Sequence, residues 1–250
     1  MSKRFKIIFA IRFLGYLIFF TGLTGFIFIL GPLVQAEFSY RADRVLGVKR
    51  TVPRLASGEK ASDGTRPTPE ASGPTSQESN EPVSNGQGEA VSFSNVTPEE
   101  NNIIPVSTEY GIVIEKINAN AKIVANVNPA NEKEYVKALA GGVAEALGST
   151  PPGEKGNLYL FSHSTDAPWN IVRFNAIFYL LKELVPGDRV IIFYQSRRYD
   201  YIVFDKVIVK PNDVSYLTNK YDSPILTLQT CDPPGTLLNR LVVRAKLASS

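Results

Sequence analysis

The chain has 250 residues, enough for one sizeable domain with accessory segments or for two small domains. The net charge is only +3, and residues 103–250 carry sixteen Lys and Arg against fourteen Asp and Glu. Nucleic-acid binding needs a basic stripe that this near-neutral balance does not provide, so the composition argues against a nucleic-acid partner. The single cysteine and the single histidine also exclude an internal disulfide and a zinc cluster built from such residues.

An uncharged apolar run occupies residues 13–36. At about 1.5 Å per residue, roughly 20 apolar residues cross a hydrocarbon core. Residues 1–12 carry four Lys and Arg side chains, and such positive charge stays on the cytoplasmic side. We therefore predict a cytoplasmic N-terminus over residues 1–12, a single-pass membrane anchor over 13–36 and an extracellular location for the rest of the chain. A cleaved signal peptide is the alternative, but its apolar region spans only ~7–15 residues.

Residues 37–102 are predicted to form a juxtamembrane segment and a disordered linker. Residues 51–102 carry three Lys and Arg against eight Asp and Glu, with hardly a large hydrophobic side chain between Leu55 and Phe93. Such a composition buries too little apolar area to offset the entropy lost on ordering. We expect a flexible acidic tether, with an end-to-end distance on the order of 40 Å for ~50 residues of random coil.

The folded domain is predicted to cover residues 103–250, where short β-rich runs alternate with turn residues. Two helical patterns interrupt the strands, at Glu132–Leu139 and Phe174–Leu184. This mixture favours a mostly-β barrel or sandwich over alternating β and α units. The predicted strands are Tyr110–Ile117, Lys122–Val127, Asn157–Ser162, Arg189–Ser196, Tyr199–Lys210, Ile225–Cys231 and Arg240–Leu247.

Three chemically competent side chains lie at the ends of predicted strands. Cys231 and His163 each close an apolar run, and Arg240 opens the strand that follows the cysteine. Adjacent strand ends would bring the three to one rim of a rigid scaffold. An ionised thiol is a potent nucleophile, a neighbouring imidazole or guanidinium favours the thiolate, and an arginine can donate to an oxyanion.

Each of these residues also has a structural interpretation. A single cysteine on an apolar strand is usually a small core side chain, and a single histidine is more often hydrogen-bonded than catalytic. Arginines at strand starts are usually solvated or paired with a carboxylate. The combination favours catalysis, because the only cysteine and the only histidine share one position in their strands in a chain that is predicted to be exported.

The motifs around these residues resemble the sortase family. The run Leu226–Cys231 reads LTLQTC, and Arg240 follows nine residues later at the head of RLVVRA. The strand LYLFSH ends at His163, 68 residues before the cysteine, and a PGD turn at 186–188 precedes two further strands. The resemblance covers residues 108–248 and leans toward the class D, E and F members. Two departures leave the class open: Ser164 follows the histidine where many members have Arg, and Asp232 follows the cysteine.

The resemblance implies a mainly-β fold, an eight-stranded sortase-type barrel with short helices, preceded here by the anchor and linker. It implies a two-step transpeptidation in which Cys231 attacks an LPxTG-like sorting signal, His163 protonates the leaving amine and Arg240 stabilises the oxyanion. The partners would be exported proteins with a C-terminal sorting signal, an amine acceptor (a cell-wall precursor or a pilin lysine) and the lipid membrane. No metal or other cofactor is expected.

Further site residues follow from the same resemblance. Arg244 lies four positions after Arg240 and is its competitor for the catalytic role, although the family pattern favours Arg240. Thr230 would hydrogen-bond the substrate carbonyl, or would be a strand threonine satisfied by a neighbour. The segment Lys210–Pro224 corresponds to the loop that shapes substrate selection, or is an inert surface turn; its candidate apolar contacts are Val214, Tyr216 and Leu217.

Two other functions remain compatible with these residues. A cysteine peptidase would use the same side chains and release its acyl group to water. A non-catalytic anchored β-domain would bind wall or partner proteins and bury Cys231 as a hydrophobic side chain.

Overall fold

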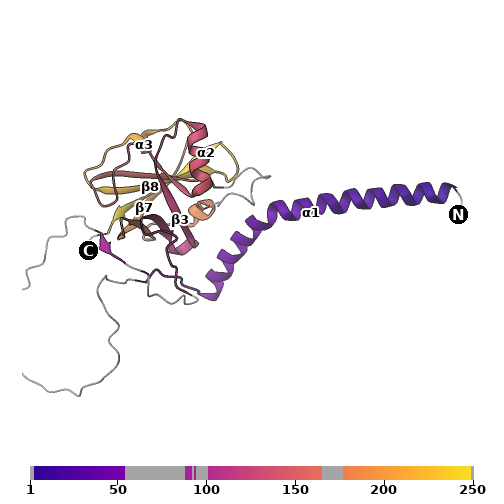
Figure 1. Ribbon diagram of the computed structural model, residues 1–250, viewed down its shortest axis with the longest axis horizontal. Helices are drawn as coiled ribbons and strands as arrows, with labels where there is room; N and C mark the ends of the chain where they lie inside the picture. The colour runs from indigo at the N-terminus through magenta and orange to yellow at the C-terminus, as the bar shows by residue number, and fades with distance from the viewer. Residues whose placement is uncertain (1–2, 54–87, 92, 94–100, 165–176, 249–250) are drawn as a thin grey trace, which may run out of the picture.

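A computed structural model describes residues 3–53, 88–91, 93, 101–164 and 177–248 (Figure 1). The chain begins with one long helix, α1 (Lys3–Leu46), which runs away from a β-rich body. Within α1, the stretch Lys6–Ile27 is long and apolar enough to cross a membrane, and none of it is buried. The hydroxyls of Thr21 and Thr24 donate to backbone carbonyls one turn earlier, at 2.7 and 2.8 Å, so these polar groups are satisfied inside the helix.

The predicted eight-stranded barrel is confirmed. Its strands follow the ring order β7-β6-β2-β3-β4-β5-β8-β9, and β7 also pairs with β9, which closes the ring. The 13-residue β7 makes this closure possible, because residues 197–202 pair with β6 and residues 201–209 pair with β9. The strands are β2 (Tyr110–Ile114), β3 (Ala119–Val127), β4 (Val143–Ala146), β5 (Gly156–Phe161), β6 (Arg189–Tyr194), β7 (Arg197–Val209), β8 (Pro224–Asp232) and β9 (Asn239–Leu247).

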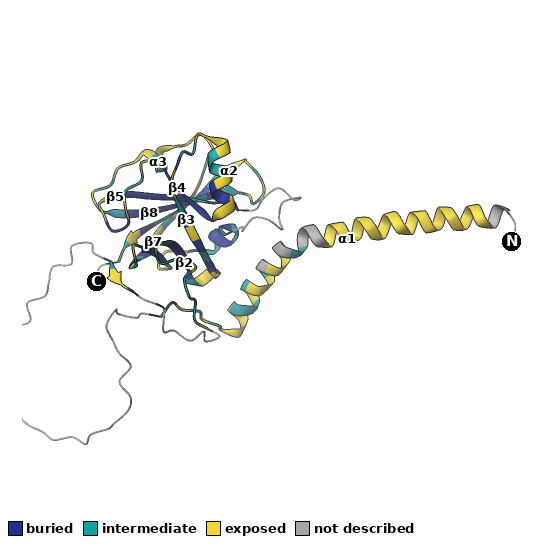
Figure 2. Ribbon diagram, in the orientation of Figure 1, coloured by how far each residue is buried: buried dark blue, intermediate teal, exposed yellow. Residues whose placement is uncertain are grey.

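Alternate residues of these strands fill the barrel, as Figure 2 shows by the dark strands of the body. On β5 and β8 the inward positions are Leu158, Leu160, Leu226 and Leu228, each at most 1% exposed. The residues between them therefore face the outside of the barrel. Cys231 therefore lies on a strand whose inward side chains are fixed in the core, and His163 follows two residues after the end of another such strand.

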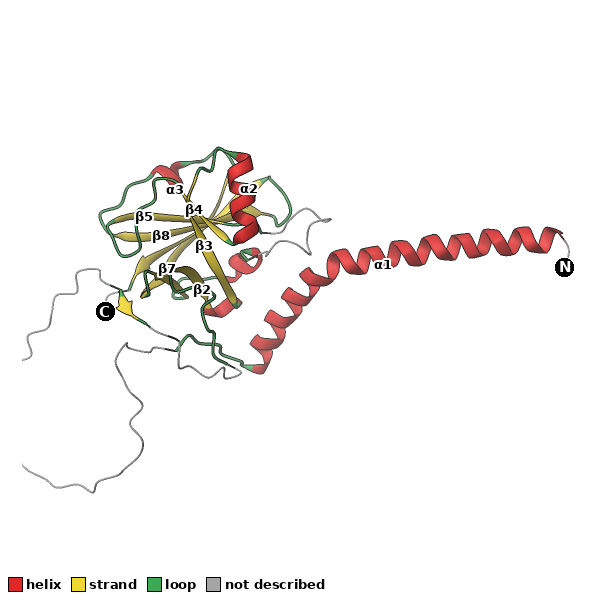
Figure 3. Ribbon diagram, in the orientation of Figure 1, coloured by secondary structure: helices red, strands yellow, loops and turns green. Residues whose placement is uncertain are grey.

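Short helices connect the strands (Figure 3). The predicted helix at residues 132–139 is present as α2 (Glu132–Gly141), whose N-cap Asn131 accepts a hydrogen bond from the Glu134 amide. A four-residue helix, α3 (Ser215–Thr218), lies between β7 and β8. Two 3₁₀ helices complete the set, η1 (Glu115–Ile117) and η2 (Tyr179–Glu183).

Three local predictions differ from the structure. The predicted strand at 110–117 ends at Ile114, because the chain turns into η1 and then adopts a left-handed conformation at Asn118 (φ 50°). In the predicted helix at 174–184, residues 174–176 lie outside the described residues and the remainder forms only the 3₁₀ helix η2. Strand β4 was not predicted, since its sequence VAEA contains helix-favouring residues that pairing with β3 and β5 overrides.

The predicted tether differs from the structure at both of its described ends. A two-residue strand, β1 (Glu89–Ala90), pairs with the start of β7. Val52, Val91 and Ile103 are buried on the outer face of β2 and β6, against Val113, Ile191 and Phe193. The physical reason is that this barrel face is itself apolar and needs a cover. We call the covering residues 51–53, 88–91, 93 and 101–103 the strap.

Gly141 and Gly142 lie immediately before β4, where the chain passes close to the backbone of β3. Gly142 has φ +153°, and a Cβ there would lie 2.2 Å from the Lys122 carbonyl oxygen. We expect Gly142→Ala to lower the free energy of unfolding by about 2 kcal/mol or more, because it combines a strained backbone with a clash against main-chain atoms.

The matched control is Gly141→Ala at the end of α2, where the nearest atom to a new Cβ is 3.7 Å away. Its effect should lie within about 1 kcal/mol of zero or be stabilising, since alanine favours the helix. Urea unfolding of both variants checks the pair, and equal losses would contradict the assignment of strain to Gly142.

Candidate active site

Strand pairing brings the three candidate catalytic residues to neighbouring strand ends, with β8 between β5 and β9. Strands β5 and β8 are parallel, with Phe161 opposite Gln229, and the Ser162 amide continues the pairing to the Gln229 carbonyl at 3.2 Å. His163 and Cys231 each lie two residues beyond this last pair, His163 just after the end of β5 and Cys231 still within β8. On the other side of β8, antiparallel pairing sets Cys231 directly opposite Arg240 of β9. Cys231 therefore lies between the histidine-bearing and the arginine-bearing strand ends.

Thr230 holds one of these strand ends in place. Its side chain is buried, and its hydroxyl donates to the Ser162 carbonyl at 2.9 Å. This bond ties β8 to the residue that immediately precedes His163. The structure thus gives Thr230 the neighbour-satisfied role that the sequence allowed as an alternative to substrate contact.

The Cys231 thiol is half-buried, and burial raises its pKa above the ordinary value. The positive charge of Arg240 acts in the opposite direction and lowers the thiol pKa. The Arg240 guanidinium donates to the carbonyls of Asn239 and Leu237, at 3.1 and 3.5 Å. No described carboxylate pairs with it, so its charge is available to the cysteine.

Arg244, the competing arginine, has a different environment. Its guanidinium donates to Asp205 at 2.6 and 3.0 Å. It also lies over the rings of Phe204 and Tyr216, with its central carbon 5.0 and 5.3 Å from the ring centres. Its register partner on β8 is Thr227, four residues from Cys231. The geometry therefore separates the two arginines: Arg240 borders the thiol, and Arg244 is engaged by a carboxylate and two aromatic rings.

The loop between β7 and β8 folds over the outer face of β5 and β8. The Asn157 side-chain amide donates to the Tyr216 carbonyl at 2.9 Å, and Thr227 in turn donates to Asn157 at 2.7 Å. Both Asn157 and Thr227 are buried beneath this cover. The three predicted substrate contacts lie on this loop, with Val214 exposed and Tyr216 and Leu217 half-buried.

Sequence reasoning missed the residues between this loop and the cysteine. The Tyr159 hydroxyl donates to the Gln229 side chain across β5 and β8. Burial raises the Tyr159 pKa, and the Arg240 charge opposes that rise, which places the phenol in the field of the candidate site. The period-two spacing of a strand would have found both residues. Tyr159 lies four residues before His163 and Gln229 lies two residues before Cys231, so each shares a strand face with its candidate catalytic residue. Across the described ranges, no group of three or more His, Cys, Asp or Glu side chains could hold a metal ion.

The sortase-domain family profile matches residues 112–248, more than half of the chain. The chain belongs to the sortase family. Sortases are cysteine transpeptidases, and the matched region contains β8, its cysteine and both neighbouring strand ends. A comparison with curated proteins found no match.

Solved sortase structures are similar to this chain at low identity. Sortase C1 of GBS pilus island 1 is 24% identical, with a TM-score of 0.48, and the match covers 56% of this chain and 64% of that one. Sortase C-1 from Actinomyces oris is 23% identical (TM-score 0.48; 58% and 77% covered). A Clostridium perfringens sortase D5 transpeptidase is 23% identical (TM-score 0.47; 59% and 82% covered). The chain thus spans just under two thirds of the first of these structures.

The opposed effects on the thiol predict how this sortase responds to loss of Arg240. Arg240→Ala removes the charge that favours the thiolate, so the Cys231 pKa should rise further and the thiol should be less ionised at any given pH. The pH profile of iodoacetamide alkylation should shift to higher pH, with slower labelling at pH 8.

Arg240→Lys keeps the charge and should leave the alkylation profile close to that of the unsubstituted protein. Arg244→Ala serves as the matched control, because Arg244 is paired with Asp205 and should not alter the thiol. A shift of equal size in the Arg244 variant would show that the two arginines do not differ as described.

Proposed function

We propose that this sortase cleaves an LPxTG-like sorting signal in exported proteins through a thioacyl intermediate on Cys231 and transfers the acyl group to an amine. The observation that supports the proposal is the pairing of β8, which puts Cys231 opposite Arg240 of β9, while the parallel pairing with β5 ends two residues before His163 and Cys231. No other cysteine or histidine is present in the chain to supply these groups.

In the first step, the Cys231 sulfur attacks the scissile carbonyl carbon and forms a tetrahedral oxyanion. Because burial keeps the thiol pKa high, the thiolate is generated by passing the thiol proton to His163. Arg240 donates hydrogen bonds to the oxyanion from the opposite strand. His163 then protonates the leaving nitrogen, the C–N bond breaks and a thioester remains on Cys231.

In the second step, an incoming amine attacks the thioester carbonyl. His163 accepts a proton from this amine, the new C–N bond forms and the C–S bond breaks. The proton returns to the sulfur, so the enzyme ends as it began. The acceptor amine in this proposal is a cell-wall precursor or a pilin lysine.

The substrate would approach along the outer face of β5 and β8, beside the loop between β7 and β8. Val214, Tyr216 and Leu217 would supply apolar contacts along this approach. Arg244 and Asn157 would act as positioning residues, since both bind the loop at Tyr216. Thr230 would position the end of β5 that carries His163.

The apolar helix α1 supports a membrane location for this reaction. The proposed anchor has its N-terminus in the cytoplasm and places the barrel outside the cell, where exported proteins arrive.

Cys231→Ala tests the chemistry directly. The full-length protein is mixed with a library of sorting-like peptides and candidate amines, and the products are identified by mass spectrometry. We expect peptide–amine conjugates with the unsubstituted protein and none with Cys231→Ala, since the variant cannot form the thioester. Conjugates from the alanine variant would overturn the assignment of the nucleophile. Free acid at every amine concentration would identify a hydrolase instead.

The contact of Arg244 with Tyr216, on the loop between β7 and β8, gives a separate prediction about KM and kcat. Arg244→Ala should raise KM several-fold with a smaller change in kcat, because it loosens the loop without touching the reacting atoms. Lys246→Ala is the control: it lies on the same strand, two residues further from the cysteine, and is exposed. A loss confined to kcat in the Arg244 variant would contradict a positioning role.

A further inference from the structure

The membrane-facing helix and the barrel contact one another directly. Glu37 of α1 lies 3.7 Å from the Lys182 ammonium, and the Tyr40 hydroxyl donates to Glu183 at 3.5 Å. The Tyr40 ring packs against the main barrel core. These contacts begin at the first residue after the predicted span 13–36, so they hold the barrel at the membrane-proximal end of the helix.

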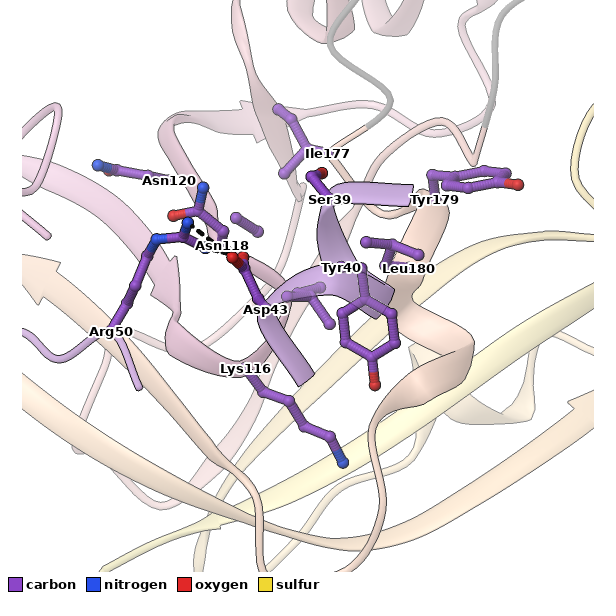
Figure 4. Close-up of a pocket in the computed structure, with 12 residues that line it drawn as sticks. Ser39, Tyr40, Asp43, Arg50, Lys116, Asn118, Asn120, Ile177, Tyr179 and Leu180 are labelled. Carbon is purple, nitrogen blue, oxygen red and sulfur yellow. Dashed lines mark hydrogen bonds and ion pairs between the residues drawn. The ribbon is translucent and has the colours of Figure 1, made fainter. Parts of the chain in front are cut away.

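The connection from helix to barrel is short. Gly47 (φ +67°) ends α1, and the Val48 amide donates back to the Asp43 carbonyl at 2.9 Å. Arg50 then forms an ion pair with Asp43, which folds the chain back along the helix (Figure 4). A cavity of about 330 Å³ lies at this junction, between Ser39 and Tyr40 of the helix and Tyr179 of the barrel.

The next residues are fixed to the barrel. Val52 is 4% exposed, its amide donates to Glu115 at 2.7 Å and its carbonyl accepts from Arg198 at 3.1 Å. Arg198 is itself buried and is held by Asp200 at 2.7 Å. Only residues 47–50 therefore separate the helix from the strap, which begins at Thr51.

The chain returns to this same point after its acidic stretch. The Thr51 amide donates to the Asn101 carbonyl at 3.0 Å, and the Ile103 amide donates to the Thr51 carbonyl at 2.9 Å. On the way back, Val91 is buried with its amide donating to Ser196 at 2.9 Å, and the Phe93 ring meets Phe193 edge-on at 5.7 Å. Gly88 is required there, because a Cβ would lie 2.7 Å from the Tyr199 ring.

We propose that the barrel is docked on α1 through the contacts of residues 37–52, and that it is not tethered to α1 by the acidic segment, because the described residues on both sides of that segment are fixed to one barrel face. The length of this acidic segment then adds nothing to the distance between membrane and active site. The inference rests on the proposed membrane anchoring, and it restricts the substrates to sorting signals presented within reach of a membrane-docked barrel. The strap covers β2 and β6, and two strands on each side of the ring separate these from β5 and β8, so the strap does not cover the face that carries Cys231.

The single thiol allows the docking to be measured without any catalysis. A donor fluorophore attached to Cys231 of the full-length protein reports energy transfer to acceptor-labelled lipids in phospholipid vesicles. Two variants change the acidic segment: one replaces residues 54–87 by ten Gly and Ser residues, and one adds 34 Gly and Ser residues within it. We expect the same transfer efficiency from both variants and from the unchanged chain.

The contrasting control places 34 Gly and Ser residues between Gly47 and Val48 and adds Tyr40→Ala and Lys182→Ala. This variant frees the barrel from the helix and should lower the transfer efficiency. A rise on shortening the acidic segment, or a fall on lengthening it, would overturn the proposal, because both are what a tether produces. Failure of the unchanged chain to co-float with vesicles would instead refute the membrane anchoring. Peptide transfer is measured separately on unlabelled protein, so failure of the proposed reaction is distinguished from failure of the docking.

Discussion

Strand β8 pairs in parallel with β5 as far as Gln229 and antiparallel with β9 through Cys231 to Asp232. The arrangement of the candidate site depends on this one strand. A register slip of one residue would turn Cys231 into the barrel and Thr230 out of it. The buried Leu226 and Leu228 resist such a slip, because it would expose both of them. The hydrophobic core thus sets the position of Cys231 as well as the stability of the barrel.

The two arginines of β9 have different surroundings, although they lie on the same face of the strand. Arg240 and Arg244 both face outward, yet among the described residues only Arg244 meets a carboxylate, at Asp205. An arginine that is already paired contributes little field to a neighbour, whereas Arg240 lowers the thiol pKa against the effect of burial. Two arginines four residues apart on β9 therefore have different surroundings, and only the surroundings of Arg240 fit the proposed catalytic role.

The sequence was sufficient for the barrel, the cysteine motif and most strand positions, because these depend on local patterns and period-two spacing. It was insufficient where long-range contacts decide. Strand β4 has a helix-favouring sequence and is a strand only because β3 and β5 flank it. The pairing of Arg244 depends on Asp205, 39 residues earlier, and nothing local distinguishes it from Arg240. The catalytic roles themselves stay predictions, supported by register and by family membership.

The acidic segment shows the limit of composition as a guide. Its few large hydrophobic residues predict that it builds no core of its own, but composition cannot say where its ends attach. Val52, Val91 and Phe93 are too sparse to build a core, yet each is placed to complete the apolar outer face of β2 and β6. The hydrogen bond between Thr51 and Asn101 closes the chain between them into a loop. The entropy lost on closing such a loop grows only slowly with the length of the loop. A segment closed in this way can lengthen or shorten with little effect on stability, while the four-residue link to α1 keeps the barrel beside its helix.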